Sequence, residues 1–175
     1  MRDYTPRRFD HAARALDIDF ALHGSGPAAS WAAAAKPGDA VHIAGPRGSM
    51  VVPTDLEWQW LIGDDAALPA IARRLEELDA AVEVTVVVLG EPGAALPPLA
   101  LDGARRIVVA TDLAEAVHGL PTPHGRGHAF AAGEHRAMQA VRAALASRHA
   151  LAGKQIRASA YWRHGDSGHH ENLEG

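Results

Sequence analysis

WQWLIGDDAALPAIARRLEEL, residues 58–78, combines a compact apolar run with an amphipathic segment, and a glycine separates the two. The first five residues predict a strand buried on both faces, because apolar and aromatic residues dominate them without regular alternation. The segment after the glycine predicts a helix with an apolar stripe formed by Leu68, Ile71, Leu75 and Leu78. The residues expected to face water on its other side are Arg73, Arg74, Glu76 and Glu77.

The same alternation of strand and helix continues to residue 162. Further apolar runs predict strands over 82–89, 106–110, 128–132 and 156–162. We expect a helix to open at Gly133-Glu134 and to end near Arg148, and loops over 90–103 and 119–127. Buried runs joined by helices favour a parallel sheet covered on both sides. The predicted fold class for residues 55–165 is therefore α/β, a three-layer domain of the nucleotide-binding kind.

Residues 1–54 have a different pattern, β-rich with one short helix. Residues 15–22 alternate between apolar and polar, the period of a half-buried strand. Gly26-Pro27 predicts a helix start, followed by a short helix over Ala28–Ala35. Short strands are expected around Val41–Ile43 and Met50–Val52. About three strands are too few to bury a core, so we interpret this region as the second half of a larger β unit, with a boundary near Pro53-Thr54.

The overall composition excludes several classes of function. The chain has 175 residues, a formal net charge of −4 and no cysteine. A mildly acidic chain is a poor candidate for sequence-independent nucleic-acid binding, and no apolar run approaches the ~20 residues of a membrane span. Without cysteines there are no disulfides or thiolate metal sites, which agrees with an expected cytoplasmic location.

The last ten residues, 166–175, are interpreted as a flexible tail. Potential metal ligands crowd this end of the chain: His164, Asp166, His169, His170 and Glu171. Imidazole and carboxylate groups suit zinc or iron. We nevertheless predict no metal site, because the segment is glycine-rich and terminal, where disorder is common.

Near the N-terminus, Arg2, Tyr4 and Thr5 form an R-x-Y-T pattern. Residues two apart on a strand point the same way, so Arg2 and Tyr4 would flank one ligand with the Thr5 hydroxyl beside them. A flavin dinucleotide requires these groups: a cation for its pyrophosphate, a ring to stack on the isoalloxazine and a nearby donor. The alternative is a chance set of residues at a chain end.

Three glycine-containing turns precede predicted helices. In HGSGPAAS, residues 23–30, small residues lead into a helix and would let a phosphate approach its free backbone N–H groups. LIGDDAALPAI, residues 61–71, and AAGEHRAM, residues 131–138, each place a glycine between a strand and a helix, the usual place for a nucleotide in an open α/β sheet. No G-x-G-x-x-G fingerprint is present, and the alternative for each is an ordinary tight turn.

The stretches RDYTPRRFD, LDIDFALHGSGPAASWA, PGDAVHIAGPRGS, WLIGDDAALPAIARRLEEL, AFAAGE and ASAYWRHG occur in this order and span nearly the whole chain. Together they resemble the siderophore-interacting proteins, a family of flavin-dependent ferric-siderophore reductases within the ferredoxin–NADP reductase superfamily. The family usually reads GDETALPA where this chain reads GDDAALPA, and it has several barrel strands before R-x-Y-T. The resemblance therefore implies the C-terminal part of a flavin-binding β-barrel over 1–54, entered in mid-barrel, followed by an NAD(P)-binding-like domain.

The resemblance also implies the site residues. Residues that would bind FAD are Arg2, Tyr4, Thr5, His23, Gly24, Gly26, Ala29 and Ser30. Residues that would line the site for reduced nicotinamide are Gly63, Asp64, Asp65, Ala66, Ala67, Gly133 and Glu134. AGEHRAM looks like a variant of the superfamily's CGP-type turn.

The implied function is reduction of ferric siderophores to release Fe(II), with electrons passing from NAD(P)H, or from ferredoxin as a protein partner, through FAD. Many ferric siderophores are anionic, so basic groups should surround the entrance: Arg7, Arg8, Lys154, Arg157 and Arg163, with Tyr161 on the strand face of Arg157 and Arg163. One alternative is a non-catalytic nucleotide- or siderophore-binding module. Another is a fragment that completes the barrel of a second chain.

Overall fold

The computed structural model describes residues 3–20, 22, 26–45, 51–91, 93, 105–165 and 171–173. Its main feature is a six-stranded sheet in the order β5-β4-β3-β6-β7-β8, in which β8 alone runs antiparallel to its neighbour. The strands are β3 (Trp58–Gly63), β4 (Glu83–Leu89), β5 (Arg105–Ala110), β6 (Gly127–Glu134), β7 (Ile156–Trp162) and β8 (Glu171–Asn172).

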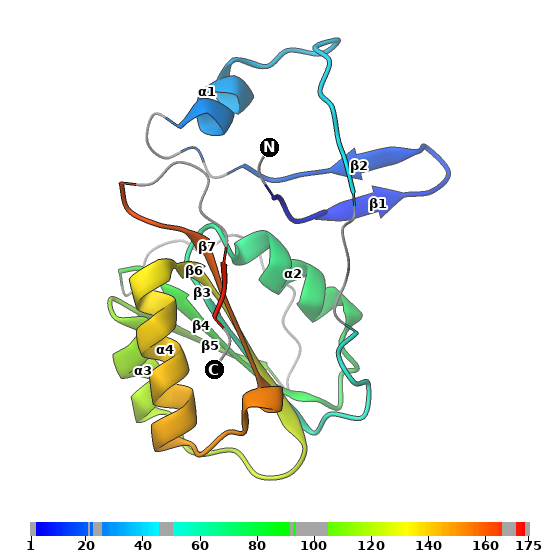
Figure 1. Ribbon diagram of the computed structural model, residues 1–175. Coiled ribbons are helices and arrows are strands. Elements are labelled where there is room, and N and C mark those ends of the chain that lie inside the picture. Colours follow the sequence, from blue (N-terminus) through cyan, green and yellow to red (C-terminus); the bar gives the residue numbers. More distant parts are fainter. Residues whose placement is uncertain are drawn as a thin grey trace.

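Helices cover both faces of this sheet (Figure 1). The helix α2 (Leu68–Glu77) lies on one face, and α3 (Leu113–Gly119) and α4 (His135–Arg148) lie on the other; a short 3-10 helix, η1 (Gly153–Gln155), precedes β7. Each face has its own apolar core. Leu61, Ile71 and Leu75 belong to the core beneath α2, whereas Ile62, Val117 and Met138 belong to the core beneath α3 and α4. The three-layer α/β fold predicted from the sequence is confirmed.

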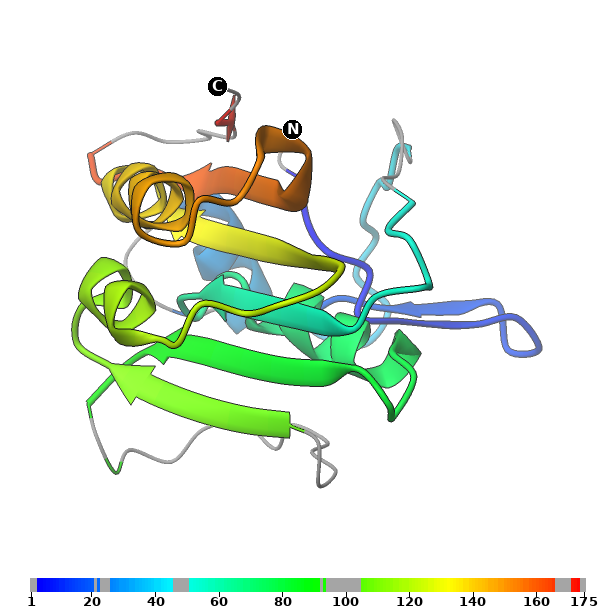
Figure 2. The ribbon, with the colours of Figure 1, turned by 90° about the horizontal axis from the view of Figure 1, so that it is seen from below.

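The first described part of the chain forms a smaller unit. It contains the antiparallel hairpin of β1 (Arg8–Asp10) and β2 (Ala15–Asp17) and the helix α1 (Pro27–Ala34). Figure 1 shows this part beyond the carboxyl ends of the parallel strands, and Figure 2 shows the hairpin projecting past α2. No described residue between 3 and 45 is buried, so this unit has no core of its own.

Several expectations for residues 1–54 are wrong in detail. The strand expected over 15–22 is shortened to β2, and no strand forms over 41–43 or 51–52; Met50 lies outside the described residues. The physical reason is pairing, because a strand needs a hydrogen-bonded neighbour and β1 and β2 pair here only with each other.

Three details of the α/β part also differ from the sequence analysis. Arg74 does not simply face water, because its Nε donates to Oε1 of the buried Gln59 at 2.9 Å. The helix α3 was not expected; it is short, and its N-cap Asp112 accepts hydrogen bonds from two backbone N–H groups of its first turn. Finally, β8 pairs with β7 inside the segment expected to be a tail, while residues 166–170, 174 and 175 lie outside the described chain. Among the described residues, no helix is long and apolar enough to cross a bilayer.

Candidate functional site

The order of the strands creates a switch point between β3 and β6. The chain leaves β3 to form α2 on one face, and it leaves β6 to form α4 on the other. In open α/β sheets, ligands bind outside the carboxyl ends of the strands at such a point. The residues predicted to line a nicotinamide site lie at the carboxyl ends of these two strands or directly after β3, and the structure brings them together there.

Asp64 connects the strand ends at this edge. Its Oδ1 accepts the N–H of Ala66 at 3.0 Å, and its Oδ2 accepts the N–H of Glu134 at 2.9 Å and Nε1 of Trp162 at 2.8 Å. The residue is only 6% exposed. Burial raises the pKa of Asp64, against the opposite effect of these three donors. One carboxylate therefore ties the ends of β3, β6 and β7 together.

Two glycines permit this close packing. A Cβ at Gly63 would lie 2.4 Å from the Cβ of Ala67 and 2.7 Å from the carbonyl oxygen of Ala132. A Cβ at Gly133, whose φ is +152°, would lie 2.6 Å from Oδ2 of Asp64. A larger residue at either position would separate the strand end from its neighbours.

The two helix N-termini at this edge differ. Glu134 caps α4, with its side chain accepting the N–H groups of Arg136 at 2.6 Å and Ala137 at 3.1 Å. Partial burial raises the pKa of Glu134, but the backbone donors lower it by more, so the pKa lies below its usual value. By contrast, the N-cap of α2, Ala67, has no side-chain cap. Instead, the N–H groups of Ala66 and Ala67 before α2 bond to the side chain and to the carbonyl oxygen of Asp64, and Ala67 is buried.

A shallow pocket of about 180 Å³ lies next to Asp64, lined by Asp64, Asp65, Leu89 and Trp162. Leu89 and Trp162 were not among the site residues predicted from the sequence. A signal was available, because Leu89 and Trp162 stand at the carboxyl ends of predicted parallel strands, where such a site would form.

On the N-terminal unit, the aromatic rings of Tyr4, Phe20 and Trp31 lie close together, and Trp31 belongs to α1. The ring centroids of Tyr4 and Phe20 are 4.7 Å apart, and those of Phe20 and Trp31 are 5.9 Å apart. Tyr4 is 41% exposed and Trp31 is 39% exposed. Two of the three rings therefore offer a surface on which a flat ligand can stack.

The N-terminus of α1 lies in the same unit and has no side-chain cap at Gly26. A Cβ at Gly26 would meet nothing within 4 Å, so the approach to the backbone of the first turn is open. The described residues therefore fit a flavin dinucleotide, which needs a stacking surface and donors for its pyrophosphate. Arg2, His23 and Gly24, also predicted to bind FAD, lie outside the described residues.

The side chains of Thr5 and Tyr161 lie next to each other, where the N-terminal unit meets β7. Burial raises the pKa of Tyr161, and the nearby Thr5 and Arg157 oppose this effect. A residue predicted to bind FAD and one predicted to bind substrate are thus in contact.

The structure does not gather the predicted basic residues. Lys154 in η1 and Arg163 after β7 lie at opposite ends of that strand, and a guanidinium nitrogen of Arg157 donates to Oδ1 of Asn172 at 2.7 Å. Arg7 and Arg8 form ion pairs with acidic residues, described below. Among the described residues, no group of three or more potential ligands could hold a metal ion.

Comparisons with known proteins agree with this architecture. The family described as "Siderophore-interacting protein" matches residues 56–165, and the family "Siderophore-interacting FAD-binding domain" matches residues 1–50. A siderophore utilization protein from T. fusca of known crystal structure superimposes with a TM-score of 0.87 at 37% identity, covering 96% of this chain and 68% of that one.

Two curated relatives are named for reduction of iron complexes. The NADPH-dependent ferric-chelate reductase of Escherichia coli is 49% identical over 77 residues, which are 44% of this chain and 30% of the relative. The ferric vibriobactin reductase ViuB of Vibrio cholerae is 28% identical over 97% of this chain and 68% of its own length. The resemblance found in the sequence is confirmed: the chain belongs to the siderophore-interacting protein family.

Proposed function

We propose that the chain takes part in the reduction of ferric siderophores, passing electrons from NAD(P)H, or from ferredoxin, through FAD to Fe(III) so that Fe(II) is released. The observation that carries the proposal is that two candidate ligand-binding features lie on one side of the fold. The helix α1, which carries the exposed Trp31 and has no side-chain cap, lies beyond the carboxyl strand ends that form the switch point (Figure 1). The family and the names of its relatives agree with this use.

In this proposal, the N-terminal unit holds FAD. Tyr4 supplies a stacking ring, Thr5 a hydroxyl, and Gly26, Ala29 and Ser30 the first turn of α1 for the pyrophosphate. Arg2, His23 and Gly24 complete the proposed set. When bound, FAD accepts electrons from a two-electron donor and passes them one at a time to iron.

The switch point positions the reduced nicotinamide. The carboxylate of Asp64 accepts three hydrogen bonds, and the one from Trp162 holds that side chain in place as one wall of the pocket. The exposed Asp65 and the half-buried Ala66 would lie beside the donor, with Ala67 buried behind them. Gly63 and Gly133 let the ends of β3 and β6 pack against Ala67 and Asp64 and so hold these residues in place. Glu134 keeps α4 capped and contributes negative charge beside the pocket.

For the ferric siderophore we propose Lys154, Arg157, Tyr161 and Arg163. Arg157 and Tyr161 lie on the same face of β7, and Tyr161 contacts Thr5 of the proposed flavin site. A siderophore held there would lie next to the flavin-binding residues. The absence of cysteine agrees with a reducing cytoplasm as the proposed location.

The test is anaerobic turnover of the purified chain with added FAD. NADH, NADPH and reduced ferredoxin are offered in turn with a ferric siderophore, and Fe(II) is trapped by a ferrous-specific chelator whose colour is recorded. We expect Fe(II) to form only when FAD is present, and more slowly in Tyr4→Ala. FAD and siderophore binding without Fe(II) from any donor would contradict the reductase and support the binding module instead.

A further inference from the structure

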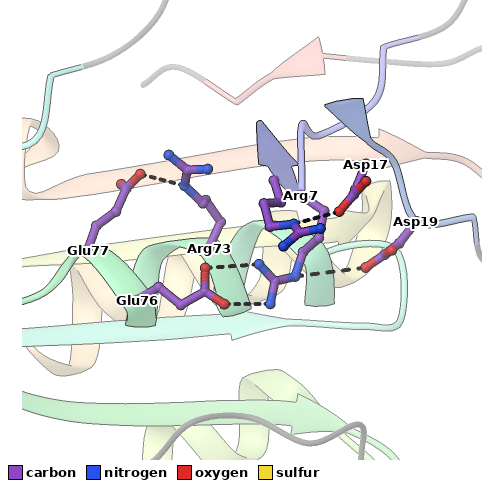
Figure 3. Close-up of polar contacts among 7 residues, drawn as sticks. Arg7, Asp17, Asp19, Arg73, Glu76 and Glu77 are labelled. Atoms are coloured by element: carbon purple, nitrogen blue, oxygen red, sulfur yellow. Dashed lines mark hydrogen bonds and ion pairs between the residues drawn. The ribbon is translucent and has the colours of Figure 1, made fainter. Parts of the chain in front are cut away.

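The side chain of Arg7 joins the N-terminal unit to α2. Its two terminal nitrogens donate to both carboxylate oxygens of Glu76, at 3.0 Å and 2.6 Å, and its Nε lies 4.0 Å from Oδ2 of Asp19. Figure 3 shows the guanidinium between these two carboxylates. Two parallel bonds from a planar guanidinium fix its orientation as well as its distance.

The backbone of Arg7 is bonded to the hairpin of the N-terminal unit. Its N–H donates to the carbonyl oxygen of Asp17, on β2, at 2.9 Å. One residue is therefore bonded through its backbone to the hairpin and through its side chain to α2. Arg8 differs, because its Nε pairs with Asp17 at 2.8 Å within the same hairpin.

In the described part of the chain, no buried side chain of the N-terminal unit reinforces the Arg7 contact. No described residue from 3 to 45 is buried, so no apolar core resists rotation of the N-terminal unit. The side chain of Thr5 lies beside Tyr161 on β7, and Val52 packs against the core beneath α2. Pro6, between Thr5 and Arg7, restricts the backbone that connects these two polar contacts.

Two separated contacts can fix an orientation that a single contact cannot. Tyr161 stands near the carboxyl end of β7, beside the switch point, whereas Glu76 stands near the last residue of α2. We propose that Arg7 is a positioning residue, which with Glu76 sets the orientation of the flavin-binding unit relative to the nicotinamide site. This inference rests on the proposed function for its catalytic consequence, but the orientation itself can be measured without any cofactor.

The absence of native cysteine makes a distance measurement direct. Ala13→Cys, in the turn between β1 and β2, and Ala140→Cys, on the exposed side of α4, provide two sites for nitroxide labels. Pulsed electron paramagnetic resonance then gives the distribution of distances between the hairpin and the α/β unit. We expect one narrow distribution in the labelled parent, and a broadened or shifted one in Arg7→Gln and in Glu76→Gln.

A matched control and an exchange of charges make the test specific. Glu77 is the next residue on α2, is as exposed as Glu76 at 45%, and pairs with Arg73 within the helix. Glu77→Gln should leave the distribution unchanged. The combined variant Arg7→Glu, Glu76→Arg and Asp19→Asn exchanges the charges and removes the carboxylate beside position 7, so it should narrow the distribution again. Unchanged distributions in both single variants, or no recovery in the exchange, would overturn the proposal.

The catalytic consequence is read separately in chain loaded with FAD. Loss of the Arg7–Glu76 pair should slow the reduction of FAD by NAD(P)H, followed by the loss of flavin absorbance, at least about tenfold, because small misplacements of reacting groups lower reaction rates strongly. The dissociation constant of FAD should not change, and the charge exchange should restore the rate. Unchanged rates in both single variants would overturn the catalytic part. A parent chain that holds no FAD would instead contradict the proposed function, while the distance measurement would still decide the role of Arg7.

Discussion

The N-terminal unit and the α/β unit place their apolar side chains in opposite ways. Among the described residues, the large apolar side chains that are exposed fall almost entirely before residue 52: Tyr4, Phe9, Leu22, Trp31, Val41, Ile43 and Val51, with Leu89 as the one later case. The buried core begins at Leu56 and continues through both faces of the sheet. The α/β unit therefore buries its own apolar side chains, whereas the described part of the N-terminal unit leaves them exposed.

The first test of this comparison removes one apolar side chain from each unit. Leu75 is 1% exposed beneath α2, and Ile43 is 61% exposed. We expect Leu75→Ala to lower the free energy of unfolding by about 3 kcal/mol, because it leaves a cavity in a packed core. Ile43→Ala should stay within about 0.5 kcal/mol of the parent. Urea titrations followed by circular dichroism measure both, and equal losses would contradict the contrast.

The second test is the pH dependence that His128 gives to the α/β unit. Burial, followed by the charges of Arg74 and Arg157, lowers the pKa of His128 from 6.5 to about 4. Between these values the unfolded chain binds the proton and the folded chain does not, so stability falls as the pH falls from 6.5 through 4. The full loss should be on the order of 3 kcal/mol.

The control for this pH dependence is His128→Gln, which keeps a polar side chain but does not titrate. Carboxylates also change charge in the lower part of this range, so the difference between the parent and His128→Gln isolates the histidine. Urea titrations at closely spaced pH values should give a difference that grows toward pH 4. Parallel pH profiles for the two proteins would show that His128 is not held neutral by its surroundings.

The third test asks whether packing or glycine itself matters at the switch point. Gly63→Ala should cost about 2 kcal/mol or more, since its Cβ would lie 2.4 Å from that of Ala67. By contrast, a Cβ placed on Gly119, the last residue of α3, would meet no atom within 4 Å. Gly119→Ala should therefore leave the melting temperature unchanged or slightly raised. A stable Gly63→Ala would contradict the close packing of β3, α2 and β6.

The fourth and smallest effect concerns the carboxylate at the strand ends. Asp64→Asn preserves the shape but removes one acceptor, so that one of the three donors loses its partner. We expect a loss of about 1–2 kcal/mol and a shift of tryptophan fluorescence as Trp162 loosens. Unchanged stability and fluorescence would mean that Asp64 does not hold the ends of β3, β6 and β7 together.

The comparison also explains what the sequence could predict. The strand in WQWLI, the helix after it and the strand over 156–162 were correct, because each carries its apolar pattern locally. The strands expected around Val41 and Met50 depended on neighbours that local patterns do not reveal. The joint contact of Asp64 with Glu134 and Trp162 arises from three strand ends far apart in the sequence, so it became visible only in the fold. The capping Asp112 was a local signal for α3 that was overlooked.

The most direct test of the account is hydrogen–deuterium exchange of the chain with and without FAD, read by mass spectrometry. Without FAD, peptides from residues 3–45 should exchange quickly and those from β3 and β4 slowly, because only the latter are buried. With FAD, we expect slower exchange at the N-terminus of α1 and around Tyr4, with little change in the central strands. Fast exchange of residues 3–45 with FAD in excess would contradict the claim that this exposed surface is the flavin site.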